Sequence, residues 1–417
     1  MAALLFSHPT GNANVRGALG GLLAAGMLGE FHTTVASFPG NAWDRLGHTA
    51  IGREFQRRRY DGPFLQALTV QHPVRELGRM LATRFKLGGL TSHETGPLCI
   101  DAVYRSLDEA TARRLKKDPR VFSGVYVYED GALQTLTAAR QNGLPGFYDL
   151  PIGYWRSART LLEPEFERMP EWAATLTGFK DSNEKLARKD AELAQATRII
   201  VASSFTARTL KDYPGKYPEP AVIPYGFPPV SSGPDRAARG SVTPGQPLRL
   251  LFVGSLSQRK GIGDLFKAVN FLGASVSLTV IGNKVTEDCP ALNRELAKHR
   301  WIPSLAHGEI LEQMRLHDIF VFPSLFEGFG LVITEAMSQG TPVITTDRTA
   351  GPDLITHGEN GWLIKAGSTD SLIAQLEQLL KEPQTIHAAG VQARKVAAAR
   401  PWPVYGQELV KALAKTI

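Results

Sequence analysis

Two glutamates separated by seven residues, Glu327 and Glu335, stand in a segment rich in glycine. A short apolar run before them predicts a strand that ends in a turn containing Gly328 and Gly330, and a helix is expected from about Leu331. The first N–H groups of such a helix attract anions, and carboxylates accept hydrogen bonds from sugar hydroxyls. The segment therefore predicts a sugar or nucleotide site. The alternative is a pair of solvated helix glutamates.

A pair of adjacent cations, Arg259 and Lys260, forms the second candidate site. A buried strand is expected to end at Gly254, and the cations precede Gly261 directly before a helix. Cations on a loop above a parallel strand are well placed to hold a diphosphate. A solvent-exposed basic turn is the competing interpretation.

Alternating strands and helices must position these residues, which predicts two parallel sheets with crossover helices. The first half is expected to hold strands at 3–7, 121–128, 147–150, 198–203 and 221–224, with a helix of small residues reaching about Glu30. The second half is expected to hold strands at 248–253, 276–281, 319–322 and 342–345.

A proline-rich stretch without periodicity separates the two halves. We expect an N-terminal Rossmann-like domain at 1–230, a linker at 231–247, a second Rossmann-like domain at 248–400 and a C-terminal helix at 401–417. Ligands of such sheets bind beyond the carboxyl ends of the strands, so the site should lie in a cleft between the domains.

The composition excludes several classes of protein. The chain has 417 residues, of which 43% are hydrophobic and 21% charged, so it is not disordered. Two cysteines are too few for a disulfide framework, and no segment reads as a signal peptide or a membrane span. We expect a cytoplasmic protein that at most lies on the inner face of the membrane.

The segment 45–90 carries nine basic and three acidic residues, a net charge of +6. Its charge could meet an anionic membrane, a nucleic acid or a phosphorylated substrate, or simply be a solvated surface. Within it, four apolar residues interleave with basic ones in the pattern of an amphipathic helix: Leu77, Met80, Leu81 and Phe85 with Arg75, Arg79, Arg84 and Lys86. The stripe Arg57–Arg59 lacks interleaved aromatic residues and any nucleic-acid motif, so we expect no nucleic-acid partner.

On these motifs the C-terminal half resembles the family 4 glycosyltransferases, retaining enzymes of the GT-B fold. The resemblance rests on the spacing of Glu327 and Glu335 and continues through 254–261, 343–346, 351–355 and 359–364. It covers nearly all of the C-terminal half, and the N-terminal half only as a general pattern. It implies an α/β protein with two Rossmann-like domains facing each other across a cleft. The domain at 1–230 would lie on the acceptor side, the domain at 248–400 would bind the nucleotide sugar, and the helix at 401–417 would pack back on the N-terminal domain.

The resemblance assigns roles to the two glutamates. It implies that Glu327 contacts the transferred sugar and that Glu335 binds the ribose hydroxyls of the donor. The backbone around the sugar and the diphosphate would come from the turn and the start of the helix: Gly328, Phe329, Gly330, Leu331 and Val332.

The resemblance also concerns the basic loop, where Lys260 matches the lysine that binds the donor diphosphate in the family. Family members usually have an arginine directly after the glycine at 254, whereas this chain has Ser255. We therefore expect Arg259 to supply the missing charge.

In the first half, Gly11 matches the glycine-rich loop that approaches the donor phosphates, with Asn12 where a second glycine is common. Glu129, Asp130 and Asp149 follow two predicted strands on the acceptor side, at places where relatives often carry histidine. The alternative for the three acids is capping or turn formation at strand ends.

The function implied is a retaining hexosyltransferase that moves a sugar from a nucleoside diphosphate, most commonly UDP in this family, to a hydroxyl acceptor. The acceptor could be lipid-linked, a cell-envelope glycan or a small molecule. Because no Asp-x-Asp motif indicates a magnesium site, we expect neither a metal nor another cofactor. The candidate catalytic residues are Glu327, Arg259, Lys260 and Asp130. A nucleotide-sugar 2-epimerase of the same fold is the alternative.

Overall fold

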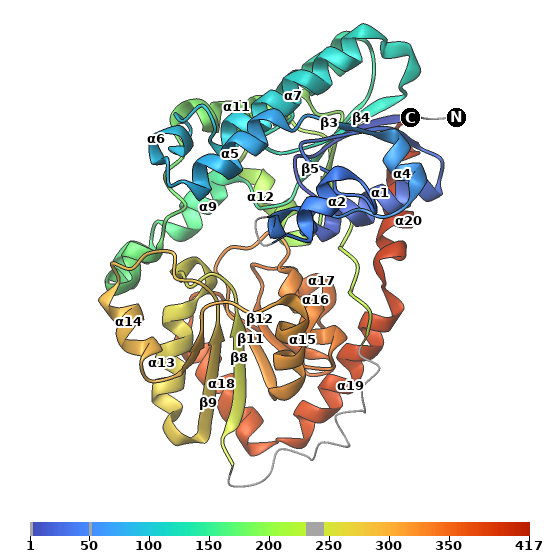
Figure 1. Ribbon diagram of the computed structural model, residues 1–417. Coiled ribbons are helices and arrows are strands. Elements are labelled where there is room, and N and C mark those ends of the chain that lie inside the picture. The colour runs from blue at the N-terminus through green and yellow to red at the C-terminus, as the bar shows by residue number, and fades with distance from the viewer. Residues whose placement is uncertain (1–2, 50–51, 231–245) are drawn as a thin grey trace.

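The computed structural model describes residues 3–49, 52–230 and 246–417, and its strands form two parallel sheets, one in each half of the chain (Figure 1). The N-terminal sheet has the order β3-β2-β1-β4-β5-β6-β7. Its strands are β1 Leu4–Ser7, β2 Leu28–Thr33, β3 Thr69–Gln71, β4 Gly124–Tyr128, β5 Gly146–Leu150, β6 Arg198–Val201 and β7 Ala221–Val222.

The C-terminal sheet has the order β10-β9-β8-β11-β12-β13 and is also parallel. Its strands are β8 Leu248–Val253, β9 Val276–Ile281, β10 Arg300–Ile302, β11 Ile319–Phe322, β12 Val343–Thr346 and β13 Gly361–Ile364. In both sheets the first strand lies inside the sheet and the order reverses beside it, which is the arrangement that opens a ligand crevice at the carboxyl ends of the strands.

Helices connect and cover the strands. In the N-terminal half they are α1 Ala13–Ala24, α2 Ala42–Gly47, α3 Arg53–Gln56, α4 Pro63–Leu68, α5 Val74–Arg84, α6 Gly88–Thr91, α7 Ile100–Lys117, α8 Leu133–Gln141, α9 Trp155–Leu162, α10 Glu165–Arg168, α11 Asn183–Gln195 and α12 Ser204–Thr209. In the C-terminal half they are α13 Ile262–Leu272, α14 Pro290–Leu296, α15 His307–Leu316, α16 Leu331–Ser338, α17 Gly351–Leu354, α18 Thr369–Lys381, α19 Gln384–Ala399 and α20 Trp402–Leu413.

The first helix is shorter than the sequence indicates. We expected it to reach about Glu30, but α1 ends at Ala24 and β2 begins at Leu28. Gly26 between them has a φ of +65°, which breaks the helix, and pairing with β1 then holds the following residues extended. The expected strand at 121–128 likewise begins later, at Gly124.

Part of the N-terminal half packs on the C-terminal domain, although it precedes the linker. The 3₁₀ turn Pro170–Thr175 places Trp172 against Phe266 of α13, with ring centroids 5.7 Å apart. Next to it, Arg168 donates two hydrogen bonds of 2.8 and 2.7 Å to the buried Asp264. The two sheets are therefore joined by this segment as well as by the linker, of which residues 231–245 lie outside the described residues.

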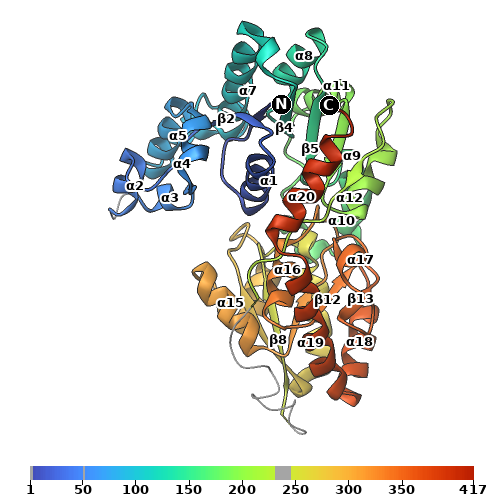
Figure 2. The same ribbon diagram turned by 90° about the vertical axis from the view of Figure 1, so that its right-hand side faces the viewer.

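The C-terminal helix α20 returns to the N-terminal domain and lies along α1 (Figures 1 and 2). The two helices approach so closely at Gly21 and Gly406 that a Cβ built on Gly21 would lie 2.5 Å from the Cα of Gly406. Tyr405, next to this contact, is fully buried against Tyr225 at the end of the N-terminal sheet.

One hydrophobic core runs through both domains and includes Phe6 and Tyr126 from the first sheet, Phe252 and Phe322 from the second, and Tyr405 from α20. Because apolar side chains of both sheets share one cluster, the domains are held together by burial as well as by polar contacts. Among the described helices, none combines the length and apolar character that crossing a bilayer requires.

Replacing Gly21 by alanine should lower the free energy of unfolding by about 1–3 kcal/mol, because the added methyl group forces α1 and α20 apart. Gly20 is the matched control, since a Cβ there meets no atom within 4 Å. Gly20→Ala should be neutral or stabilise by up to about 1 kcal/mol, as expected for a glycine inside a helix. Urea denaturation of the two variants checks this, and equal effects would contradict the role of the close contact.

Candidate functional site

The loop between β11 and α16, which we name the signature loop (323–330), carries the first predicted glutamate. β11 ends at Phe322, and Gly330 precedes α16 with a φ of +87°, a left-handed conformation that favours glycine. The first N–H groups of α16 have no partner within the helix and can hold an anion. Leu331 and Val332, at this helix start, are half-buried.

Lys260 and Arg259 both contact Glu327. The Lys260 ammonium pairs with Glu327 Oε2, and Arg259 Nη1 lies 3.4 Å from the same oxygen. Arg259 Nη1 also donates a 2.9 Å hydrogen bond to the carbonyl of Phe326. The structure thus brings together the basic loop and the first glutamate of the spacing, although Lys260 and Glu327 are 67 residues apart in the sequence.

Burial sets the electrostatics of this cluster. It lowers the pKa of Lys260 well below its usual range, and the positive charge of Arg259 lowers this pKa further. The ion pair with Glu327 acts in the opposite direction, because a carboxylate favours the charged ammonium. Burial lowers the pKa of Arg259 as well. Two poorly hydrated cations therefore lie beside one carboxylate. A bound anion would be strongly stabilised by these cations.

Glu335 lies on α16, about one turn after Gly330, and its Oε1 is 3.1 Å from His307 Nε2 at the start of α15. This hydrogen bond raises the pKa of His307 above its ordinary value. The sequence alone does not indicate His307 as a site residue, because its partner is 28 residues away. Glu335 is half-buried and His307 is exposed, so the pair is accessible to a ligand.

Two residues of the signature loop face the N-terminal domain. A Cβ on Gly328 would lie 2.0 Å from the Pro151 carbonyl oxygen, and the Gly328 carbonyl accepts hydrogen bonds from Ser203 and Thr206. Phe329 is buried and its ring lies 4.8 Å from that of Tyr225. The Gly328 carbonyl and the Phe329 side chain are thus held by the N-terminal domain, and the expectation that the backbone of this turn surrounds the sugar and the diphosphate stays a prediction.

The glycines of the two strand-ending loops are required for different local reasons, packing at Gly11 and backbone conformation at Gly254. A Cβ on Gly11 would lie 2.6 Å from the Tyr60 hydroxyl oxygen, so Tyr60 alone requires glycine there. Asn12 is exposed and precedes α1, and its side chain makes no capping hydrogen bond. In the C-terminal domain Gly254 has a φ of +155°, and Ser255 is exposed beside it.

Asp149, which we expected on the acceptor side, lies buried within β5 of the N-terminal sheet. Its side chain is 1% exposed and accepts a 2.5 Å hydrogen bond from the Tyr126 hydroxyl. Burial raises its pKa to about 7, although hydrogen bonds from Tyr126 and Tyr128 oppose the rise.

Glu129 and Asp130 are committed to ion pairs with α11. Glu129 is buried with its Oε1 3.1 Å from Lys189 Nζ, and Asp130 lies 3.5 Å from the same ammonium and 3.7 Å from Arg188. Asp130 has a φ of +71°, held by a hydrogen bond from its N–H to Glu192. Burial raises the pKa of Glu129, while Lys189 opposes the rise. Neither acid is positioned as a free base.

A cavity of about 260 Å³ lies between the domains where α9 and α11 meet Arg259, and we name it the α9 cavity. No sequence pattern indicates it, because its walls come from four separate segments. They are Ile152, Gly153, Trp155, Ala158, Arg159, Leu162, Gly178, Phe179, Asp181, Leu186, Lys189, Arg259 and Phe326.

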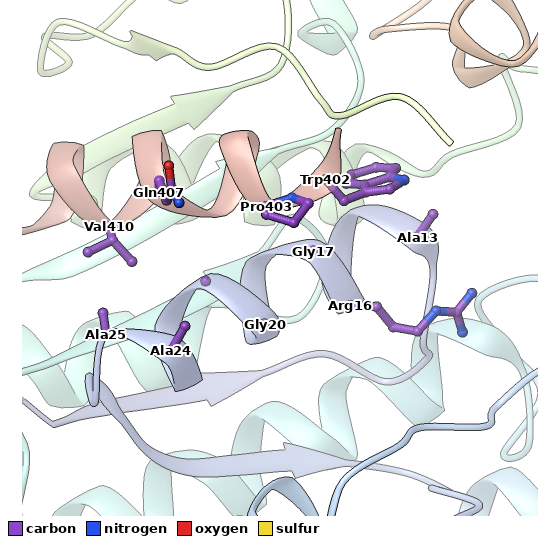
Figure 3. A pocket seen from close by; sticks show the side chains of 11 residues that line it. Ala13, Arg16, Gly17, Gly20, Ala24, Ala25, Trp402, Pro403, Gln407 and Val410 are labelled. Atoms are coloured by element: carbon purple, nitrogen blue, oxygen red, sulfur yellow. The ribbon is translucent and has the colours of Figure 1, made fainter. Parts of the chain in front are cut away.

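A groove of about 840 Å³ runs between α1 and α20, and none of the predicted site residues is among the described residues that line it (Figure 3). Small residues of α1, among them Gly20 and Ala24, face Gln407 and Val410 of α20 across it. The groove follows from the close approach of the two helices, because side chains this small leave space beside the contact.

One group of potential metal ligands also assembles. His93, Glu94 and Asp181 bring one ligand atom each within 4.8 Å of one another. Lys185 Nζ lies 3.1 Å from Asp181 Oδ1 and 3.1 Å from Asp101 Oδ1, so an ammonium already pairs with one of the three potential ligands.

The pH dependence of stability should report the burial of Asp149. An aspartate in the unfolded chain has a pKa of about 3.9, so between about pH 4 and 7 the folded protein holds a proton that the unfolded chain has released. The contribution of this group to stability therefore falls as the pH rises through that range. In Asp149→Asn the group cannot ionise, and the melting temperature relative to the wild type should increase from pH 5 to pH 8. A constant difference across this range would contradict the assignment.

Comparisons with known proteins agree with this architecture. Residues 235–396 match the family model of the glycosyl transferases group 1. The capsular polysaccharide biosynthesis glycosyltransferase CapM of Staphylococcus aureus is 31% identical over 157 residues, which cover 34% of this chain and 40% of CapM. The D-inositol 3-phosphate glycosyltransferase of Nocardia farcinica is 27% identical over 312 residues, 67% of this chain and 68% of that protein. The chain spans about 40% of the length of the first curated relatives it matches.

Solved structures share the whole fold. Anabaena HepE, in complex with UDP, superposes with a TM-score of 0.62 over 100% of both chains at 16% identity. The sucrose-phosphate synthase of Thermosynechococcus elongatus gives a TM-score of 0.62 at 18% identity, covering 100% of this chain and 99% of that one. The expected fold class is thereby confirmed. The chain has the two-domain GT-B fold, and its residues 235–396 match the glycosyl transferases of group 1.

Proposed function

We propose that the protein is a retaining glycosyltransferase that transfers a sugar from a nucleoside diphosphate to a hydroxyl acceptor. UDP is the donor nucleotide that we propose first, and the transfer needs no metal ion. The observation that carries the proposal is the cluster of Lys260, Arg259 and Glu327 at the start of α16. UDP is the first donor nucleotide to test, because HepE, which shares the fold, was solved in complex with UDP.

The cluster suits the departure of a nucleoside diphosphate. Negative charge develops on the leaving phosphate, and Lys260, Arg259 and the free N–H groups of α16 can stabilise it in a site with little water. Lys260 exchanges its partner when the donor binds: the ammonium leaves Glu327 for the diphosphate. Glu327 is then free to accept hydrogen bonds from the sugar, and Glu335 from the ribose.

Retention follows from attack on the same face of the sugar. The bond between the anomeric carbon and the phosphate oxygen breaks, the acceptor oxygen bonds to that carbon, and the acceptor proton passes to the leaving phosphate oxygen. This route needs no protein base, which agrees with the ion-paired state of Glu129 and Asp130. Two cations and a helix N-terminus take the electrostatic role that a magnesium ion would otherwise have.

Substitution of the two glutamates tests the assignment of roles. Glu335→Ala should weaken UDP binding about 10- to 150-fold, because a charged hydrogen-bond partner of the ribose contributes about 1.5–3 kcal/mol. Glu327→Ala should not weaken the affinity for free UDP, because it removes the carboxylate that competes with the diphosphate for Lys260, but it should impair sugar transfer, since Glu327 contacts the sugar. Calorimetric titration with UDP in EDTA, followed by transfer assays, measures both effects.

Glu312→Gln is the matched control, because Glu312 is a carboxylate on α15 with no hydrogen bond or ion pair to the described residues. Equal loss of UDP affinity in the Glu335 and Glu327 variants would contradict the two distinct roles. Incubation with the nucleotide sugar alone distinguishes a glycosyltransferase from the epimerase alternative. An epimerase would convert the donor sugar to its epimer in the absence of an acceptor.

We propose further that the protein reaches a lipid-linked acceptor at an anionic membrane surface. The observation in favour is the surface of α5 and α6, on which Leu81, Phe85, Leu87 and Leu90 are exposed beside two basic residues, Arg84 and Lys86. Apolar side chains next to cations are typical of helices that lie in a membrane interface.

The structure changes which arginines can serve this surface. Arg79 is bound to Glu76 through 2.8 and 2.6 Å hydrogen bonds, and Arg75 donates to the Pro97 carbonyl. Arg58 is buried and pairs with the same Glu76, so Arg57–Arg59 is no continuous basic stripe for a nucleic acid.

Membrane binding should therefore depend on Arg84 and Lys86 and not on Arg75 and Arg79, which are held by Pro97 and Glu76. Arg84→Glu with Lys86→Glu should weaken binding to vesicles containing phosphatidylglycerol by at least roughly 30-fold, because each cation at such a surface contributes about 1 kcal/mol. Phe271→Ser, which removes an exposed aromatic side chain of α13 in the other domain, is the control and should bind as the wild type does. Vesicle flotation measures both, and unchanged binding of the double variant would overturn the membrane proposal.

A further inference from the structure

The α9 cavity adjoins the centre of the proposed reaction. Arg259 lines the cavity, and its Nη1 is 3.4 Å from Glu327 Oε2, the carboxylate proposed to contact the transferred sugar. The opposite wall belongs to the N-terminal domain, with Trp155 and Arg159 on α9. A group held in this cavity would thus stand next to the sugar, on the side of the acceptor domain.

Among the charged groups around the cavity, one guanidinium group has no polar partner in the described structure and a second has N–H groups that are not used. Lys189 is neutralised by Glu129 and Asp130, and Asp181 by Lys185. The side chain of Arg159 makes no hydrogen bond or ion pair with any residue that the structure describes, and its guanidinium carbon lies 5.3 Å from the centroid of the Trp155 ring.

Arg259 is the second of these groups. It uses Nη1 for the Phe326 carbonyl and for Glu327, whereas Nε and Nη2 have no hydrogen-bond partner among the described residues. Burial already destabilises its charge, so an anion beside it would relieve a desolvated cation. Arginine forks recognise phosphate and carboxylate oxygens in particular, because two N–H groups can donate in parallel.

The remaining walls indicate what carries the anion. Trp155, Phe179 and Phe326 present aromatic side chains, and Ile152 and Leu162 add apolar surface. Flat apolar faces suit the C–H side of a sugar or polyol ring. A volume of about 260 Å³ lies below the roughly 300–1,000 Å³ of sites for drug-sized ligands, so the cavity holds one small group and not a long lipid chain.

We propose that the α9 cavity binds a negatively charged substituent, a phosphate or a carboxylate, on the sugar or polyol acceptor, and that Arg159 and Arg259 are the residues that select it. The proposal rests on the glycosyltransferase function proposed above and specifies the sugar or polyol part of its acceptor as anionic; a lipid linked to that part would lie outside the cavity. Arg159 acts on the acceptor alone, because it has no contact with Glu327, Lys260 or α16 in the described structure.

The test compares three probes by calorimetric titration in EDTA with excess UDP: glucose 6-phosphate, glucuronate and glucose. The wild type should bind at least one charged probe tenfold or more tightly than glucose. Arg159→Gln should lose this preference and keep its affinity for UDP within twofold. A preference for glucose 6-phosphate over glucuronate identifies a phosphate site, and the reverse preference a carboxylate site.

Arg156→Gln is the matched control. Arg156 lies on the same helix and also packs on Trp155, but it pairs with Asp190 and does not line the cavity. It should therefore keep the preference for the charged probe. If neither charged probe binds the wild type more tightly than glucose, or if Arg159→Gln keeps the preference, the proposal is wrong. UDP binding by the wild type reports on the donor site separately, so failure of the proposed function gives a different result.

Discussion

The contact between Gly328 and the Pro151–Ile152 backbone determines how the two domains face each other. No side chain fits there, because a Cβ would lie 2.0 Å from the Pro151 carbonyl oxygen, and hydrogen bonds from Ser203 and Thr206 fix the Gly328 carbonyl. The neighbours of Gly328 are fixed with it. Phe326 packs on Gly153, and Glu327 is held beside Lys260. The carboxyl ends of β5 and β11 therefore meet at a defined distance, and the site is assembled from both domains.

The two cations of the basic loop, Lys260 and Arg259, lie at different places relative to the domain contact. Lys260 and Arg259 are adjacent in sequence and both contact Glu327, yet they border different spaces. Lys260 is 4.9 Å from the centroid of Phe322, close to the start of α16, whereas Arg259 lines the α9 cavity. Arg259 thus borders the α9 cavity as well as Glu327, whereas Lys260 lies toward the start of α16. The three acids expected on the acceptor side all have partners in the protein, namely Tyr126, Lys189 and Arg188. Among the described residues that line the α9 cavity, Arg159 is the charged side chain without an ion pair.

Stability and site geometry are linked through segments that cross between the domains. The turn Pro170–Thr175 and Arg168 belong to the first half of the chain but pack on α13, and α20 belongs to the second half but packs on α1. Each crossing buries aromatic or charged groups that would be solvated if the domains separated widely. The stacking of Trp172 on Phe266 and the contact of Tyr405 with Tyr225 thus tie segments from both halves of the chain together.

The sequence by itself determined the fold class and the local motifs of the C-terminal half. Continuous apolar runs predict parallel strands, glycines mark the turns that follow them, and the spacing of Glu327 and Glu335 depends only on one loop and one helix. Only the tertiary structure decided that Asp149 is buried and that Glu335 meets His307. It also decided that Arg159 reaches the cavity lined by Arg259, 100 residues later in the sequence. The reason is physical: strand and helix patterns are short-range, whereas burial and charge pairing depend on residues that adjoin only after both domains have folded and docked.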